Sequence, residues 1–598
     1  MMPAALRTRG APLLVAVIVF LVFLPALGNG FVDWDDETLL VQNLAYRGLG
    51  WSQVRWMFST VLLGHYVPLT WLTWGLDYVL WGMNPVGYHL TSLLLHVTSA
   101  VLLVFIARRL LGAATAFSAT SLEIGSVVAA LFFAIHPLRV ESVVWVTERR
   151  GVLSGALFLG SVLMYLKGAE AQGPRRRWCL SLSAAAYLGA AVAKSSVMTL
   201  PLVLVLLDVY PLRRLRGGVR EWFTRTNRWI WSEKIPFLAV GLVATLLGYG
   251  AHAEGSPHVD ASWLSRVTNV AYSLTFYLAK TAFPVALSPR YEAPLTLDPL
   301  EPRFLAAILG VVGLTMLALV SMRRSPLGIT LWAAYGILLA PVSGVIPLAS
   351  QLTADRYSYL PCLGWAVLVG AGSAAVAEAG SQGAIRPALL RLAAAAMAFW
   401  FLALSVLTWR QAEVWRDSES LWRHAVLATP ECSLCHVNRG NWLQTHGDLE
   451  PAVRHYQEAL ILRPSRVPVH ANLAWALTQL GRLPEAAAHY RVLLTHDPTL
   501  IGVRSNLASV LLADGRPSEA IDVLRQATEV SPPDRVIAFF SEALVTRPDD
   551  ASSRLGLLKA YLTLGRLDLA REQYEVLRQR HPSLSVSVGA LLPAITSE

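Results

Sequence analysis

The chain has 598 residues, of which 54% are hydrophobic and only 15% are charged, and its formal net charge at pH 7 is +10. This composition is too apolar for one soluble domain, and the length allows several domains. The excess positive charge lies before Arg410, between apolar runs. It therefore indicates loops on the cytoplasmic side of a membrane and argues against nucleic-acid binding, which needs a basic face on a folded module. Four cysteines are too few for a disulfide-built fold.

Apolar runs long enough to cross a bilayer recur as far as Arg410. The first is expected to be an uncleaved span with a cytoplasmic N-terminus, because Arg7 and Arg9 precede it and no small-residue cleavage site follows. Two apolar runs lie between the outer loop at 251–263 and Arg323 on the inner side, where an odd number of crossings is required. One of these runs, or part of 285–303, is therefore expected to be re-entrant or interfacial. Eleven true crossings and an outer C-terminal part are favoured. The expected runs lie near residues 11–28, 88–107, 124–137, 151–166, 178–193, 196–210, 235–250, 264–284, 304–322, 327–346, 361–378 and 391–409.

The rest of the chain repeats itself with a period of 34 residues. The pattern is that of the tetratricopeptide repeat, in which glycine allows the turn between two helices, alanine allows them to cross closely and proline closes the second helix. Such solenoids bind a peptide or a partner protein on a concave face and rarely catalyse; the alternative is a scaffold without a specific ligand. The positions that recur include Gly447, Gly481 and Gly515; Ala452, Ala486 and Ala520; and Pro430, Pro464, Pro498 and Pro532.

Together these patterns predict an all-α protein. Residues 1–410 are expected to form a polytopic membrane domain with about eleven to twelve hydrophobic segments, and residues 411–598 a tetratricopeptide-repeat α-solenoid.

The first outer loop carries three carboxylates within four residues, Asp33, Asp35 and Asp36. Adjacent carboxylates can act as a general base with a polarising neighbour, or as ligands of a hard cation. The alternative is an acidic, solvated turn that caps a helix beginning near Glu37.

Further polar groups are expected on the same outer face. Arginine beside carboxylates suits a phosphate, which its guanidinium can hold with two hydrogen bonds, whereas structural ion pairs and buried, hydrogen-bonded histidines are the alternatives. Because charge is costly at membrane depth, several loops that converge in this way indicate a functional cavity. The candidates are His65, His96, His136, Arg139, Glu141, Glu148, Arg149, Lys194, Asp355, Arg356 and Tyr357.

The run Cys432-Ser-Leu-Cys435-His436 has the form of a c-type haem attachment motif. It falls inside the 34-residue frame, and the sequence holds no other haem motif, so haem is disfavoured. The two cysteines are expected either to form a disulfide or to stay reduced.

Several motifs, in order, resemble the transmembrane and tetratricopeptide-repeat-containing proteins and their bacterial relatives. The resemblance covers nearly the whole chain, repeats included. The motifs that carry it include Phe31-Val-Asp-Trp-Asp-Asp36, His65-Tyr-Val-Pro68, His136-Pro-Leu-Arg-Val-Glu141, Ala193-Lys194 and Ala354-Asp-Arg-Tyr-Ser-Tyr359.

This resemblance implies a glycosyltransferase C fold that moves a mannose-like hexose from a polyprenyl-phosphate carrier to a protein Ser/Thr hydroxyl. Asp35 and Asp36 match the acidic pair in which the catalytic base is expected. The donor phosphate is expected at Arg139, Arg149, Lys194 or Arg356. No metal is expected. Repeats that recruit the acceptor polypeptide would be periplasmic, on a bacterial inner membrane.

Three departures from the common bacterial pattern, Ser92, Arg150-Gly151 and Ser195-Ser196, leave the identity of the sugar open. Two other classes of protein also remain. A non-catalytic tetratricopeptide scaffold for envelope assembly would not need the outer-loop charges. A transporter of lipid-linked sugars would need ionisable groups along a path through the bilayer.

Overall fold

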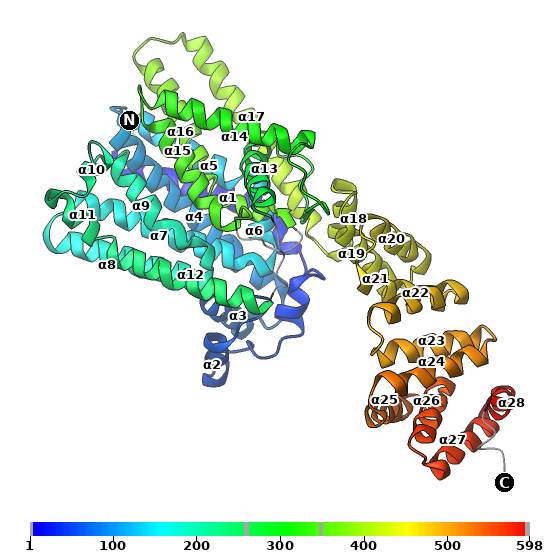
Figure 1. The fold of residues 1–598 in the computed structure, drawn as a ribbon. Helices are drawn as coiled ribbons and strands as arrows, with labels where there is room; N and C mark the ends of the chain where they lie inside the picture. Colours follow the sequence, from blue (N-terminus) through cyan, green and yellow to red (C-terminus); the bar gives the residue numbers. More distant parts are fainter. Residues whose placement is uncertain (1–3, 256–261, 346–350, 592–598) are drawn as a thin grey trace. The chain divides into compact units, whose positions relative to one another are not determined.

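The structure is a computed structural model that describes residues 4–255, 262–345 and 351–591. Within these ranges the chain is almost entirely helical, and its one sheet pairs β1 (Tyr291–Glu292) with β2 (Gln351–Thr353) in antiparallel fashion. The chain divides into two compact units, Met1–Thr429 and Pro430–Glu598. The predicted all-α class is confirmed (Figure 1).

Every apolar run expected from the sequence overlaps a helix of the first unit. The 410/411 boundary suggested by the end of the apolar sequence falls inside α17. The helices are α1 (Ala4–Val22), α2 (Trp51–Ser59), α3 (Pro68–Trp81), α4 (Pro85–Ala114), α5 (Ala119–Ala134), α6 (Val140–Val144), α7 (Arg149–Glu170), α8 (Gly173–Ala193), α9 (Leu200–Val209), α10 (Val219–Trp222), α11 (Arg228–Ser232), α12 (Ile235–Gly255), α13 (Trp263–Ala282), α14 (Pro302–Ser321), α15 (Leu327–Leu339), α16 (Leu363–Ser381), α17 (Pro387–Val414) and α18 (Ser418–Ala428).

Five of the described helices are long and apolar enough to cross a membrane, and up to seven are if two bent pairs each count as one span. One bent pair joins Ala119–Ala134 to Pro137–Val144 at an angle of 57°. The break falls at His136, because a residue before proline disfavours the α conformation. The protein is thus an integral membrane protein, while the eleven crossings remain a prediction.

The paired helices α7 and α8 run between two opposite ends of the first unit. Helix α7 has 22 residues and is therefore about 33 Å long. Glu170, at its end, pairs with Arg109 at 3.7 Å. Glu148, just before its start, contacts Lys194, which directly follows α8. Basic loops therefore gather at one end of these helices and the predicted site at the other.

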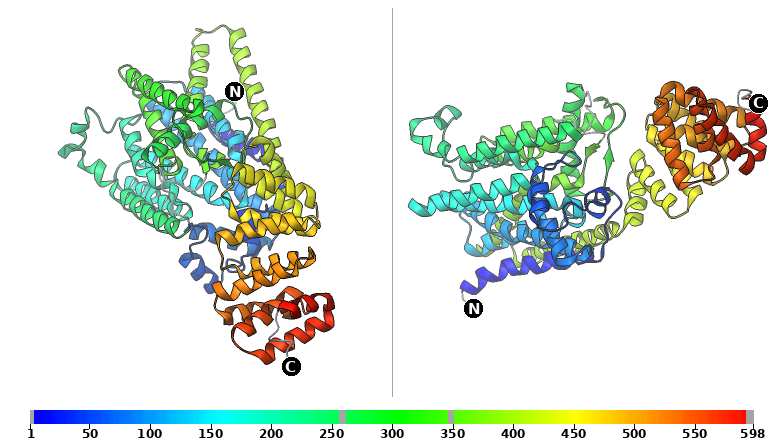
Figure 2. Two further views of the ribbon diagram at one scale, coloured as in Figure 1. Left: turned by 45° about the vertical axis from the view of Figure 1, so that its right-hand side comes forward. Right: turned by 90° about the horizontal axis from the view of Figure 1, so that it is seen from below.

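The second unit is a row of helix pairs, seen in Figure 2. Alanines at the 34-residue spacing, such as Ala452 and Ala486, are fully buried where the helices cross. Gly447, Gly481 and Gly515 have φ near +85°, +74° and +73°, which L side chains rarely adopt. The helices are α19 (Ser433–Thr445), α20 (Leu449–Leu462), α21 (Val467–Gln479), α22 (Leu483–His496), α23 (Ile501–Ala513), α24 (Pro517–Val530), α25 (Pro533–Thr546), α26 (Ala551–Thr563), α27 (Leu567–Arg580) and α28 (Pro582–Leu591).

Candidate active site

A cavity of about 560 Å³ opens in the first unit at the end where α7 begins. Its wall combines the first loop, the turn after α8, helix α12 and the segment that follows β2. Six residues singled out in the sequence line it: Asp35, His65, Glu148, Lys194, Arg356 and Tyr357. The structure therefore brings together groups that lie more than 300 positions apart in the chain.

Asp35 is the carboxylate of the first loop that lines the cavity, and it is partly buried. Burial raises the pKa of Asp35 above its ordinary value, and the guanidinium groups of Arg150 and Arg356 partly oppose that rise. A carboxylate that faces a cavity with a raised pKa can take a proton from a hydroxyl group.

Asp36 has a different environment, because it is only 1% exposed and does not line the cavity. One of its oxygens accepts from the amide of Thr147 at 3.0 Å and from the Thr147 hydroxyl at 2.5 Å, and the other accepts from the amide of Val32 at 3.1 Å. Burial raises the pKa of Asp36 to about 6. Although a short helix (Glu37–Val41) follows, the Asp36 carboxylate ties the loop to Thr147 and does not cap that helix.

The cavity wall contains a network of ion pairs centred on Glu148, whose side chain is 1% exposed. Glu148 contacts Lys194, Arg150 at 3.1 Å and Arg356 at 3.9 Å. Arg356 also contacts Glu141, whose carboxylate accepts from the Arg356 amide at 2.7 Å. Three cations thus face two carboxylates, and the excess positive charge suits an anion such as a phosphate.

Two tryptophans add an aromatic wall to the cavity. Trp34 stacks on Trp145 with ring centroids 4.8 Å apart, and Trp145 stacks on Trp415 at 5.7 Å. The guanidinium carbon of Arg356 lies 5.4 Å from the Trp145 ring centroid. Flat apolar faces beside cations can pack against a sugar ring or an isoprenoid.

Several predicted residues lie away from the cavity wall. Arg149 is fully buried, where it contacts Asp77 and donates to the carbonyl of Tyr88 at 2.5 Å. The guanidinium of Arg139 lies against the rings of Phe133 and Tyr359, at 5.3 and 5.8 Å from their centroids. These two arginines join helices and loops inside the first unit.

His96, His136 and Asp355 are also buried, and each has a hydrogen-bond partner inside the first unit. His96 lies 2.9 Å from the Tyr359 hydroxyl and 3.0 Å from the carbonyl of Ala134. His136 lies 3.0 Å from the carbonyl of Thr281. Asp355 accepts from the Tyr291 hydroxyl at 3.0 Å. Glu141 does not line the cavity, but it belongs to the ion network through its contact with Arg356.

Two cations of the cavity, Arg150 and Arg290, are not among the site residues predicted from the sequence. Arg150 follows Glu148 and Arg149 at a position where the family pattern differs, and Arg290 lies in the link between α13 and α14, where no motif marks it. Among the described residues, no group of three or more His, Cys, Asp or Glu side chains could hold a metal ion.

Fold and site define a polytopic helical membrane protein with a charged, aromatic cavity and a tetratricopeptide array. The tetratricopeptide-repeat family model matches residues 437–500 and 505–585. The chain is 26% identical to the protein O-mannosyl-transferase Tmtc3 of Drosophila melanogaster over 408 residues, 60% of this chain and 43% of that protein. It is 25% identical to human TMTC1 over 392 residues, 56% of this chain and 42% of that protein.

The resemblance seen in the motifs is therefore confirmed: the chain is similar to TMTC proteins and carries tetratricopeptide repeats. The chain spans less than half the length of these curated relatives. Among solved structures, ArnT from Cupriavidus metallidurans bound to undecaprenyl phosphate is 18% identical, with 80% of this chain and 79% of that chain covered and a TM-score of 0.32. The tetratricopeptide protein YrrB is 17% identical over 28% of this chain and 97% of that chain, with a TM-score of 0.20.

Proposed function

We propose that this protein is a glycosyltransferase that moves a hexose from a polyprenyl-phosphate carrier to a Ser/Thr hydroxyl of a polypeptide. The observation that carries the proposal is the cavity in which Asp35 faces a cluster with excess positive charge. The curated relatives named above are protein O-mannosyl-transferases, which supports the same class of reaction.

In the proposed reaction Asp35 accepts the proton of the acceptor hydroxyl, whose oxygen attacks the anomeric carbon. The bond between that carbon and the phosphate oxygen breaks, and the phosphate leaves with the electron pair. Lys194, Arg356 and Arg150 stabilise the charge that develops on the phosphate. In this proposal Arg149 and Arg139 do not contact the phosphate but stabilise the structure around the cavity, because both are buried inside the first unit.

In this proposal the donor lipid enters the cavity from the bilayer, and the aromatic faces of Trp34 and Trp145, which line the cavity, contact the sugar or the first isoprenoid units. His65 and Tyr357, on the same wall, are available to bond sugar hydroxyls. In the proposed reaction a carboxylate takes the proton and ammonium and guanidinium groups balance the phosphate charge, so the proposal includes no metal.

We place the repeats on the cavity side of the membrane, as an arm that recruits the acceptor polypeptide. Two hydrogen bonds support this placement, because they hold the last helix of the first unit, α18, beside the first loop. The Asp33 amide donates to the Ser418 hydroxyl at 2.6 Å, and the Trp422 ring donates to the Asp33 carbonyl at 3.3 Å. The chain therefore leaves the first unit at its cavity end.

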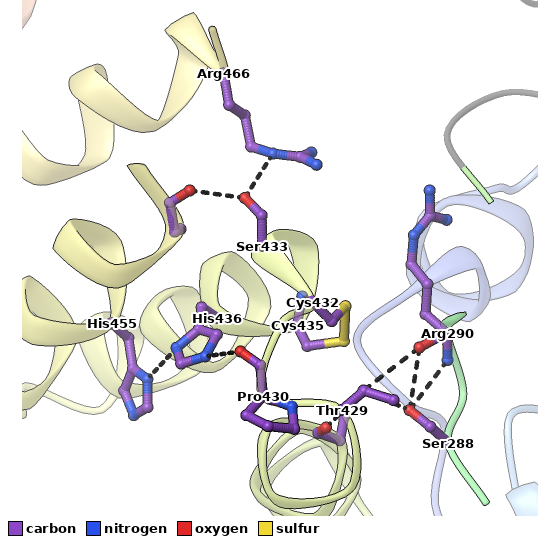
Figure 3. The surroundings of a disulfide bond; sticks show 12 residues. Ser288, Arg290, Thr429, Pro430, Cys432, Ser433, Cys435, His436, His455 and Arg466 are labelled. Carbon is purple, nitrogen blue, oxygen red and sulfur yellow. Dashed lines mark hydrogen bonds between the residues drawn. A yellow bond between two sulfur atoms is a disulfide. The ribbon is translucent and has the colours of Figure 1, made fainter. Parts of the chain in front are cut away.

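A disulfide also supports an outer location, the periplasm of a bacterium. Cys432 and Cys435 are bonded to each other at the start of α19 (Figure 3). Disulfides persist in oxidising compartments such as the periplasm. Both thiols of the haem-like motif are thus engaged, and its histidine, His436, contacts the Pro430 carbonyl at 3.1 Å and His455.

The deciding experiment measures hexose transfer by membranes that contain the wild-type chain or Asp35→Asn. The donor is radiolabelled polyprenyl-phosphate mannose, and periplasmic proteins are the acceptors. The proposal expects transfer by the wild type and its loss in the variant. A scaffold or a transporter predicts no transfer by either chain, and with that result the proposal would be abandoned.

A further inference from the structure

Residues 213–229, here called the arginine segment, link α9 to α12 at the end of the helices away from the cavity. The segment contains α10 and the start of α11. Its single acid, Glu221, accepts from the Gly218 amide at 3.3 Å. Five arginines on it are exposed: Arg213, Arg216, Arg220, Arg225 and Arg228. Within the described ranges no ion pair joins any of the five to an acid.

The arginine segment also exposes large apolar side chains. Val219 is 61% exposed, Phe223 65% and Trp229 45%. The Phe223 ring stacks on Trp231 at 4.8 Å, so the aromatic side chains form a group. Arginine and aromatic residues side by side suit the headgroup layer of a bilayer, where phosphates meet the guanidinium groups and the rings sit at the level of the lipid carbonyls.

A buried ion cluster fixes both ends of the segment. Asp208, just before it, is fully buried and accepts from the Tyr165 hydroxyl at 2.7 Å, from Arg214 at 2.9 Å and from Lys234 at 2.5 Å. Glu233, just after it, accepts from Arg214 at 2.5 Å. These two acids pair with the inner cations and with none of the five exposed arginines, whose charge is left for an external partner.

An apolar cavity of about 180 Å³ reaches Tyr210 and Pro211, the residues that lead into the segment. Its other walls come from α4, α7, α9, α15 and α16, with side chains such as Leu111, Leu331 and Leu368. A dry cavity with a carbon lining at membrane depth excludes water and accepts a hydrocarbon chain.

We propose that the arginine segment binds an anionic phospholipid of the leaflet on its side of the membrane, with the phosphate on the arginines and an acyl chain in the apolar cavity. This lipid site is separate from the catalytic cavity and is independent of the proposed function. The charge selects an anionic lipid over a zwitterionic one, because the arginines must be paired by the headgroup.

The test uses the full chain purified in neutral detergent, with phosphatidylglycerol or phosphatidylcholine added. Phosphatidylglycerol is expected to raise the Tm and to remain bound in native mass spectra, and high salt should weaken both effects. The variant Arg216→Gln/Arg220→Gln/Arg225→Gln/Arg228→Gln should bind phosphatidylglycerol more than about tenfold more weakly. Ala334→Phe, which fills the apolar cavity, should also weaken binding without a change of charge.

The matched control also removes four exposed arginines, but from the repeats: Arg454→Gln/Arg535→Gln/Arg547→Gln/Arg566→Gln. It should bind phosphatidylglycerol as the wild type does. An equal response to phosphatidylcholine, or full binding by the arginine-segment variant, would overturn the proposal. So would stabilisation by RNA in place of phosphatidylglycerol.

Discussion

Thr147 donates its amide and its hydroxyl to the same carboxylate oxygen of Asp36, at 3.0 and 2.5 Å. This double hydrogen bond pins the first loop to the segment that carries Glu148, the centre of the ion network. Asp35, the neighbour of Asp36, is thereby held on the cavity wall. The two adjacent carboxylates of this motif thus lie in different environments, because Asp35 faces the cavity and Asp36 faces the protein interior.

Asp35→Asn is expected to lower hexose transfer by about 10²- to 10⁴-fold, because general-base catalysis contributes that much. The Tm should stay near that of the wild type, since the side chain is only partly buried. Asp33→Asn, two residues away on an exposed side chain, is the matched control and should keep full activity. Equal losses in the two variants would mean that loop charge, and not the base, matters.

Asp36→Asn is expected to lower the free energy of unfolding by about 1–3 kcal/mol. The new side-chain NH₂ cannot accept a hydrogen bond, so the buried N–H of Val32 or of Thr147 loses its acceptor. Thr147→Val removes one of the donors and should cost less. Denaturant unfolding of the two single variants and the double variant measures the coupling between the side chains. Additive effects would show that the pair does not hold the loop.

The pH dependence of Asp36 has a definite sign. Its pKa is about 6 in the folded chain and near 3.8 when the chain is unfolded, so the folded state binds the proton more tightly. The contribution of Asp36 to stability is therefore fully present below pH 3.8 and is lost as the pH rises through 6. The difference in unfolding free energy between wild type and Asp36→Asn, measured between those pH values, should follow this course.

Removal of Glu148 should be more harmful than removal of one of its partners. Glu148→Gln leaves Lys194 and Arg150 buried without their carboxylate and is expected to cost about 3–5 kcal/mol of stability. Lys194→Gln leaves Glu148 paired with Arg150 and Arg356, so the fold should persist. Its effect should appear in the kinetics with the lipid donor, as a lower kcat/KM. Unchanged kinetics in a folded Lys194→Gln protein would remove Lys194 from phosphate binding.

The apolar runs and the repeats could be predicted, because hydrophobic runs and periodicity are properties of a linear sequence. Which member of an adjacent pair faces the cavity could not. Arg149 and Arg150 begin α7, where successive side chains point about 100° apart, and only Arg150 reaches the cavity. That choice depends on how α7 is rotated against α3 and α4, where Asp77 and Tyr88 hold Arg149. Neither contact is encoded near the pair in the sequence.

Two histidine pairs recur at the repeat spacing in the second unit. The Nδ1 atoms of His470 and His489 are 2.8 Å apart, and those of His436 and His455, 34 positions earlier, are 3.1 Å apart. In the last repeat the corresponding positions hold Arg554 and Gln573, and the Arg554 guanidinium donates to the Gln573 side-chain oxygen at 3.3 Å. Each histidine pair can share one proton but not hold two, because two N–H groups would then face each other.

The repeats are therefore expected to lose stability in mild acid. Burial, His436 and nearby arginines lower the pKa of His455 to about 4, and burial also lowers the pKa of His470 and, together with His470, that of His489. A lowered pKa means that the unfolded chain binds protons first, so stability is present above pH 6.5 and is lost as the pH falls toward 4. The double variant His470→Arg/His489→Gln, which copies the last repeat, should show a shallower fall of Tm over that range. A fall as steep as that of the wild type would show that the His470–His489 pair does not govern the acid response.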